Sequence, residues 1–147
     1  VLVVTGGSQG GLQAMLTAAI HPKITAAVAV VPAGCDQSGP DAGRSPGWPQ
    51  WYFQADGKDL SRVKQASLYY DIVNFTPRIH CPIFVAAGLI DILCPPPGII
   101  AATNRISGPK EVMVMPFGGH QDRHEVCNAR VEEWFSILKQ GKVPEIK

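Results

Sequence analysis

A serine between paired glycines near the start of the sequence has the surroundings of a nucleophile. Residues 6–11 read Gly-Gly-Ser-Gln-Gly-Gly, which places the pattern Gly-x-Ser-x-Gly in register on Ser8. The apolar run Val1–Val4 comes just before this stretch, and a helical pattern follows it. A serine at so tight a strand-to-helix turn projects its hydroxyl away from the sheet, and the glycines leave room for the turn. The pattern therefore predicts a nucleophile at position 8.

A serine hydroxyl is a weak nucleophile and needs a general base that an acidic group orients. Asp91 follows the expected strand Pro82–Ala87, and His120 follows the expected strand Glu111–Met115. The order Ser, Asp, His, with each residue just after a strand, is typical of hydrolytic sites at the carboxyl edge of a parallel sheet. We therefore expect His120 to act as the base for Ser8, and Asp91 to hold the imidazole.

Two further features would serve acyl transfer at Ser8. The backbone N–H of Gln9 directly follows the nucleophile at a helix N-terminus, where it can stabilise an oxyanion. Trp48 and Trp51 lie in a stretch rich in Gly and Pro, and they could line a pocket for a sugar ring. Tryptophans more often pack into a core, so the sequence supports both interpretations of this pair.

The elements that must position these residues alternate between apolar strands and helices. Strands that are apolar on both faces are typical of a parallel sheet covered by helices on each side. Right-handed crossovers between such strands predict an α/β fold, in a single domain spanning residues 1–147. The expected strands are Val1–Val4, Ile24–Val31, Pro82–Ala87 and Glu111–Met115, and the expected helices are Gly10–Ala19, Lys58–Asp71, Pro97–Ile106 and Asp122–Lys139.

The last expected helix should bury one face against the sheet. Its apolar positions are Val126, Val131, Trp134, Phe135 and Leu138. Gly141 follows the last periodic residue and is placed to end the helix with a left-handed residue.

The first expected strand is apolar on both faces but has no partner on one side of a four-stranded sheet. Such an exposed edge is unusual because unpaired backbone groups invite aggregation. We therefore expect further strands before Val1 in a longer protein, and any targeting signal, for the cytoplasm or for export, would lie in that part.

Composition favours a globular protein without nucleic-acid or membrane partners. The 147 residues are 46% hydrophobic, and the formal net charge of +1 includes no basic block. No apolar run reaches the roughly 20 residues that a membrane span needs. The four cysteines form no Cys-x-x-Cys pair and show no zinc-finger spacing, so free thiols are expected at Cys35, Cys81, Cys94 and Cys127.

A second interpretation assigns the glycine-rich turn to a dinucleotide. Residues 5–11 are similar to the Thr-Gly-x-x-x-Gly-x-Gly turn of short-chain dehydrogenases, but Leu12 stands where the last glycine belongs. No acidic residue ends the second strand, and no Tyr is followed by Lys four positions later. An inactive fragment is a third interpretation, because one fold hosts many functions and a chain without its N-terminal strands can carry a triad that does not work. Taken singly, the glycine-rich turn could bind phosphate and Asp91 could cap a turn.

Taken together, the motifs resemble the acetyl xylan esterase and cephalosporin C deacetylase family of α/β-hydrolases. The resemblance covers nearly the whole chain and corresponds to the C-terminal half of such enzymes. It implies an α/β-hydrolase fold, with Ser8, Asp91 and His120 as the triad and Gln9 as an oxyanion donor. The segments that carry it are 6–11, Cys35-Asp36, 47–51, 87–91 with 94–96, 104–106, 108–111 and Gly119-His120.

The resemblance also implies an activity. Members of this family hydrolyse small O-acetyl esters on sugars, especially xylose-based oligosaccharides, without a cofactor or metal and often as closed homo-oligomers. Prolyl-oligopeptidase-like hydrolases share the elbow and the triad order, and they are the nearest alternative within the fold. The family's second oxyanion donor comes from the region before the elbow, and loss of one donor costs about 100- to 1000-fold in turnover. We therefore expect the isolated chain to be poorly soluble and nearly inactive, and the parent protein to be an esterase.

Overall fold

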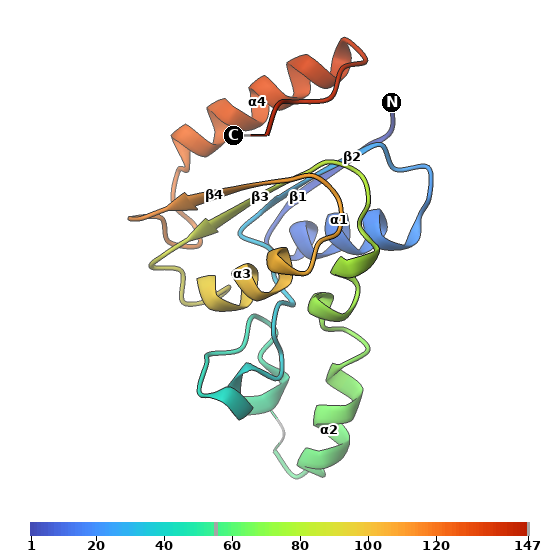
Figure 1. The fold of residues 1–147 in the computed structure, drawn as a ribbon. Coiled ribbons are helices and arrows are strands. Elements are labelled where there is room, and N and C mark those ends of the chain that lie inside the picture. The colour runs from blue at the N-terminus through green and yellow to red at the C-terminus, as the bar shows by residue number, and fades with distance from the viewer. Residues whose placement is uncertain (55, 147) are drawn as a thin grey trace.

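A parallel sheet with the strand order β1-β2-β3-β4 forms the centre of the structure (Figure 1). The computed structural model describes residues 1–54 and 56–146, so Ala55 and Lys147 of the expected domain lie outside the described residues. The fold confirms the expected α/β architecture. The strands are β1 (Val3–Gly7), β2 (Ala26–Val30), β3 (Ile83–Gly88) and β4 (Lys110–Met115).

Helices cover both faces of the sheet. In Figure 1, α1 and α3 lie on one face and α4 lies on the other. No helix in the described part of the chain is both long and apolar enough to cross a membrane. The helices are α1 (Gln9–Ile20), α2 (Leu60–Ser67), α3 (Pro96–Asn104) and α4 (Glu125–Lys139), and short 3₁₀ turns span Gly39–Ala42, Trp51–Phe53, Ile72–Asn74 and Thr76–Arg78.

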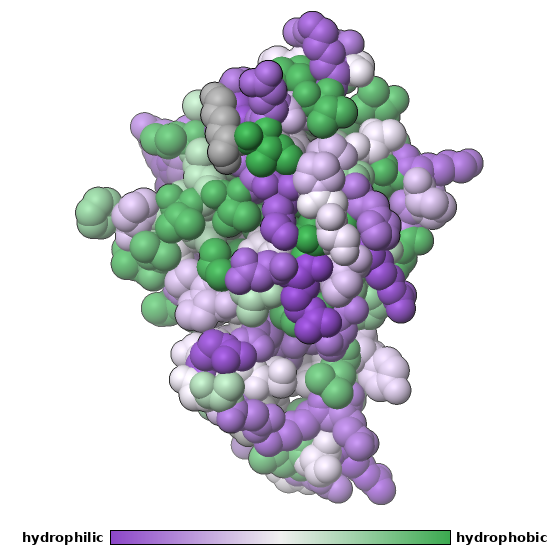
Figure 2. All heavy atoms as spheres, in the orientation of Figure 1, coloured by the Kyte–Doolittle hydropathy of each residue, from purple (hydrophilic) through white to green (hydrophobic). Residues whose placement is uncertain are grey.

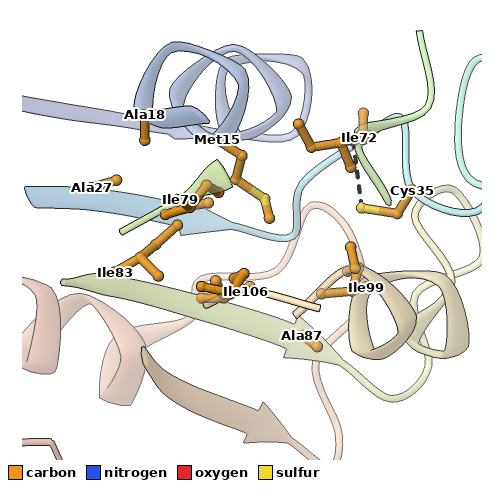
Figure 3. Packing of buried hydrophobic residues seen from close by; sticks show 14 of the residues in the cluster. Met15, Ala18, Ala27, Cys35, Ile72, Ile79, Ile83, Ala87, Ile99 and Ile106 are labelled. Carbon is orange, nitrogen blue, oxygen red and sulfur yellow. Dashed lines mark hydrogen bonds between the residues drawn. The ribbon is translucent and has the colours of Figure 1, made fainter. Parts of the chain in front are cut away.

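The larger core fills the space between the sheet and the layer of α1 and α3. Met15 of α1 and Ile99 of α3 are fully buried there, in one cluster with Ala27 and Ile83 of the central strands, and Figure 3 shows Ile99 beside Ala87. The alanine side chains of β2 are short, which lets α1 approach that strand closely. This packing fixes the start of α1, and therefore the turn that carries Ser8, against the sheet.

The second core lies under α4, and it differs from the expected apolar face. Trp134 packs edge-to-face on Phe84 of β3, with ring centroids 5.7 Å apart. The prediction was wrong at Val126, which is 76% exposed, whereas Cys127 beside it is buried in this core. Arg130 is buried in this face instead, where it pairs with Glu111 at the start of β4. Gly141 ends the helix at a φ of 72°, as expected.

The segment between β2 and β3 projects away from the sheet together with α2 (Figure 1). The expected helix Lys58–Asp71 is shorter in the structure, where Asp59 caps its start and it ends at Ser67. Asp71 instead anchors this segment. Its buried carboxylate accepts hydrogen bonds from the backbone N–H groups of Asp36 (3.0 Å), Gln37 (2.7 Å) and Val73 (3.0 Å). Asp71 therefore ties the start of the projection to the turn that returns toward β3.

Candidate active site

Ser8 occupies a strained turn between β1 and α1. Its backbone angles are φ 51° and ψ −119°, a region that non-glycine residues avoid unless the surrounding structure holds them there. The Ser8 N–H donates to the carbonyl of Val30 at 2.9 Å. The Ser8 carbonyl accepts from the N–H groups of Leu12 at 3.1 Å and Ala33 at 2.9 Å. These three bonds join the elbow to α1 and to the end of β2, and they supply the constraint that the strained angles require.

The glycines around Ser8 are explained by close backbone contacts. A Cβ atom added at Gly6 would lie 2.3 Å from the carbonyl carbon of Gly10. A Cβ at Gly11 would lie 3.0 Å from the Cα of Pro32, whereas one at Gly10 would meet nothing within 4 Å. Gly6 is therefore a steric requirement of the turn, and Gly10 is not.

The structure brings the three expected triad residues together. The Nε2 atom of His120 lies 2.8 Å from the hydroxyl oxygen of Ser8, and its Nδ1 atom lies 2.8 Å from Oδ2 of Asp91. The Asp91 side chain is fully buried and the His120 side chain is 13% exposed. A serine hydroxyl, a histidine and a buried carboxylate in this order form a relay that can remove the hydroxyl proton.

The carboxylate of Asp91 is held by the backbone of its own loop. Its Oδ1 atom accepts hydrogen bonds from the N–H groups of Leu93 (2.9 Å) and Cys94 (2.8 Å), which leaves Oδ2 for His120. A Cβ at Gly88 would lie 2.3 Å from the carbonyl oxygen of Gly118, so the loops after β3 and β4 pack directly on each other. This contact sets the separation between Asp91 and His120.

A small cavity opens beside the Ser8 hydroxyl. Its volume is about 200 Å³, and it is lined by Ser8, Gln9, Trp48, Leu93, His120 and Gln121. Gln9 is the first residue of α1, so no preceding helical turn supplies a carbonyl to accept a hydrogen bond from its backbone N–H. Trp48 is held in place because its N–H donates to the carbonyl of Leu93 and its carbonyl accepts from Gly34.

The structure separates the two tryptophans that the sequence placed together. Trp48 lines the cavity at Ser8, but Trp51 lies in a different hollow, beside Lys58, Val63 and Tyr70 of the α2 region. Trp51 is therefore not placed at the candidate site. Two lining residues, Leu93 and Gln121, were missed by the sequence analysis, although each lies within two positions of a predicted triad member.

Two other hollows lie away from Ser8. One apolar hollow, with a volume of about 500 Å³, lies between β4 and α4 and is lined by Met113, Phe117 and His124 among others. Figure 2 shows apolar residues gathered on the side toward which the strands point, at the left of the view. His21 and His80 line another hollow at the opposite, amino edge of the sheet, away from Ser8.

All four cysteines are free, as expected, and one of them borders the triad. One nitrogen of His120, the thiol sulfur of Cys94 and one carboxylate oxygen of Asp91 lie within 4.8 Å of one another. Burial, followed by the nearby charge of Asp91, raises the pKa of the Cys94 thiol to about 12. The thiol is therefore protonated at neutral pH. Within residues 1–54 and 56–146, these three are the residues whose donor atoms lie close enough together to hold a metal ion.

Comparison with known proteins decides the family. The acetyl xylan esterase (AXE1) family matches residues 1–138. The chain belongs to this family. A curated acetyl esterase, Axe7A of Xylanibacter ruminicola, is 38% identical over 117 residues, which make up 80% of this chain and 26% of that protein. The dehydrogenase interpretation of the glycine-rich turn is therefore rejected.

Solved structures show the same fold. The acetyl xylan esterase from Paenibacillus sp. R4 matches with a TM-score of 0.75 and 31% identity, over 89% of this chain and 44% of that one. Acetyl xylan esterase 1 from Thermoanaerobacterium sp. matches with a TM-score of 0.73 and 25% identity, over 88% and 43%. A puromycin hydrolase matches with a TM-score of 0.75, but at 20% identity it shows only the shared α/β-hydrolase fold. The chain thus spans less than half the length of these relatives.

Proposed function

We propose that the protein containing this chain removes O-acetyl groups from sugars, with Ser8 as nucleophile, His120 as general base and Asp91 as its orienting partner. The observation that carries this proposal is the continuous relay from Ser8 to Asp91, with two contacts of 2.8 Å on a strained elbow. Membership of the acetyl xylan esterase family supports the choice of an acetyl ester as substrate.

The reaction proceeds by two acyl transfers. His120 accepts the Ser8 proton as the oxygen attacks the acetyl carbonyl, and Asp91 stabilises the imidazolium that forms. The backbone N–H of Gln9 donates to the developing oxyanion, with the N-terminus of α1 adding its positive dipole end. His120 then protonates the departing sugar alcohol. Water, activated by the same imidazole, releases acetate and restores Ser8.

The dimensions of the cavity favour a small acyl group. Pockets for drug-sized ligands occupy about 300–1,000 Å³, so a space of about 200 Å³ beside Ser8 suits an acetyl group better than a peptide or a long acyl chain. Trp48 and Leu93 form an apolar wall of this space, and Trp48 is partly exposed. An exposed indole face can stack on the apolar face of a sugar ring outside the acyl site.

The deciding experiment compares the parent protein with its Ser8→Ala variant. We expect the parent to release acetate from p-nitrophenyl acetate and from acetylated xylo-oligosaccharides, and the variant to release it from neither at a rate above background. A peptide p-nitroanilide is the third substrate, because related hydrolases of this fold cleave amides. Activity on the peptide alone would replace the proposal with a peptidase, and full activity in Ser8→Ala would reject Ser8 as nucleophile.

A further inference from the structure

The thiol of Cys94 faces the catalytic relay from the loop that carries Asp91. Its sulfur lies within 4.8 Å of a nitrogen of His120 and an oxygen of Asp91, and both of these residues belong to the candidate triad. Ester hydrolysis by the relay needs no thiol at this place. Cys94 is therefore a nucleophilic group next to the site that the proposed mechanism does not use.

Asp91, Cys94 and His120 offer one oxygen, one sulfur and one nitrogen donor. This donor set suits a soft or borderline cation such as Zn²⁺ or Cd²⁺, and it does not suit Mg²⁺ or Ca²⁺, which prefer oxygen ligands. Three protein ligands with an open fourth position are a common arrangement for zinc. No other trio of His, Cys, Asp and Glu residues in ranges 1–54 and 56–146 brings its donor atoms this close together.

We propose that Asp91, Cys94 and His120 form an inhibitory site for a thiophilic divalent cation, so that Zn²⁺ or Cd²⁺ reversibly blocks the active site. The inhibition rests on the proposed esterase function, whereas the binding of the cation does not. The cation enters through the cavity lined by Ser8 and His120. It replaces the thiol proton, which is released to solvent, and forms bonds to the sulfur and to the imidazole.

The geometry explains why binding and catalysis exclude each other. Zinc bonds of about 2.0–2.3 Å place neighbouring ligand atoms roughly 3.3–3.7 Å apart, so donors spread over as much as 4.8 Å must draw together around the ion. Both ring nitrogens of His120 are already engaged, one with Ser8 and one with Asp91. A cation on either nitrogen therefore breaks one of the two contacts on which the relay depends.

The test measures cation binding and inhibition separately. Cd²⁺ is titrated into the parent protein carrying Cys81→Ser, which removes the one half-buried thiol, and the ultraviolet sulfur-to-cadmium charge-transfer absorption is recorded. Acetate release is measured in the same samples, with EDTA added afterwards and with Mg²⁺ as the control cation. We expect one equivalent of Cd²⁺ to produce the absorption and to abolish activity, with EDTA reversing both effects and Mg²⁺ producing neither.

Three variants separate the proposed site from other thiols and from catalysis. Cys94→Ser should lose the absorption and weaken Cd²⁺ binding at least about 100-fold, because loss of a direct ligand costs no less than loss of its supporting partners. Cys127→Ala is the matched control, since it removes a buried thiol away from the trio, and it should bind like the parent. Ser8→Ala should still bind Cd²⁺ although it cannot turn over substrate.

Failure of the proposed metal site and failure of the proposed esterase function give different results. Absorption that persists in Cys94→Ser, or its absence from an active parent, would overturn the metal site and leave the esterase proposal intact. Absorption that depends on Cys94 in a parent without esterase activity would support the site and reject the proposed function.

Discussion

One oxygen of the Asp91 carboxylate is reserved for His120. Oδ2 lies 2.8 Å from Nδ1 of the imidazole, while Oδ1 accepts two backbone N–H groups from the residues that follow. The carboxylate therefore cannot rotate to exchange its two oxygens without breaking three contacts. The loop after β3 thus fixes the position of the His120 imidazole and favours the tautomer that carries its proton on Nδ1.

This arrangement predicts the effect of Asp91→Asn. The amide oxygen should remain with the two backbone N–H groups, which turns the NH₂ group toward Nδ1 of His120. The histidine must then carry its proton on Nε2, where it cannot accept one from Ser8. We expect kcat to fall by about 10³–10⁴-fold. Steady-state kinetics on p-nitrophenyl acetate measure the loss, and an unchanged circular dichroism melt controls for unfolding; a fall of less than tenfold would contradict the tautomer argument.

The elbow predicts different outcomes at two glycines four positions apart. Gly6→Ala places a methyl group 2.3 Å from the Gly10 carbonyl carbon, so the turn must open and Ser8 must leave its contact with His120. Gly10→Ala meets no atom within 4 Å, and it should stabilise α1 by about 0.5–1 kcal/mol because alanine is the better helix former.

Activity and thermal unfolding of these two variants provide the measurement. We expect Gly6→Ala to be inactive or unfolded and Gly10→Ala to keep the parent's kcat with an equal or higher melting temperature. If both variants lose activity and stability to a similar extent, the steric contact between Gly6 and Gly10 does not explain the need for glycine in the turn.

Much of the fold and the triad could be predicted from the sequence because the relevant signals are local. Buried parallel strands are continuous apolar runs, and Gly6 is required by a contact with Gly10, only four positions later. Asp91 and His120 follow their strands directly, so chain order and strand direction were enough to place them at one edge of the sheet.

The parts that the sequence missed depend on contacts between distant segments. The buried pair of Arg130 and Glu111 joins residues 19 positions apart, and a charged residue on a helix gives no local indication that it will be buried. Trp48 and Trp51 are three positions apart and have the same type, yet only Trp48 is tied by backbone bonds to the loop after β3. Which of them lies at Ser8 depends on that tertiary contact.

The separation of the tryptophans predicts different kinetics for their alanine variants. Trp48→Ala removes part of the wall beside Ser8, so we expect KM for acetylated xylo-oligosaccharide to rise by about 3- to 10-fold, as loss of one aromatic stacking contact implies. The kcat on p-nitrophenyl acetate should change less, because that substrate lacks the sugar. Trp51→Ala should leave both values within about twofold; an equal rise in KM for the two variants would contradict the assignment.

The buried thiol of Cys127 predicts a loss of stability at alkaline pH. Burial raises its pKa to about 11 from the ordinary value of 9.0, so the folded state holds the thiol proton more tightly than the unfolded state. The stabilisation that this protonated thiol contributes to the folded state is fully present below pH 9.0 and is lost as the pH rises from there through about 11. Urea unfolding of the parent and of Cys127→Ala at several pH values measures how the free energy of unfolding depends on pH. This free energy should fall less steeply with pH in the variant, and an equal fall in both proteins would show that the Cys127 thiol does not contribute.

The ion pair of Arg130 and Glu111 predicts a stability loss that leaves the chemistry intact. The side chains are only 8% and 7% exposed, and the indole N–H of Trp134 also donates to Glu111. Arg130→Met leaves a buried carboxylate without its main partner, which should lower the free energy of unfolding by about 3–5 kcal/mol.

A second substitution distinguishes the pair from general packing at this position. Glu111→Leu combined with Arg130→Met removes both charges, so the double variant should regain part of the lost stability, because an unpaired buried charge costs more than the Trp134 N–H that loses its acceptor. Glu111 lies near the start of β4 and His120 follows the other end of that strand, so the folded fraction of every variant should keep the parent's kcat. Urea unfolding and active-site titration together measure both quantities. A double variant that is no more stable than Arg130→Met alone would show that the arginine stabilises α4 by its own packing instead.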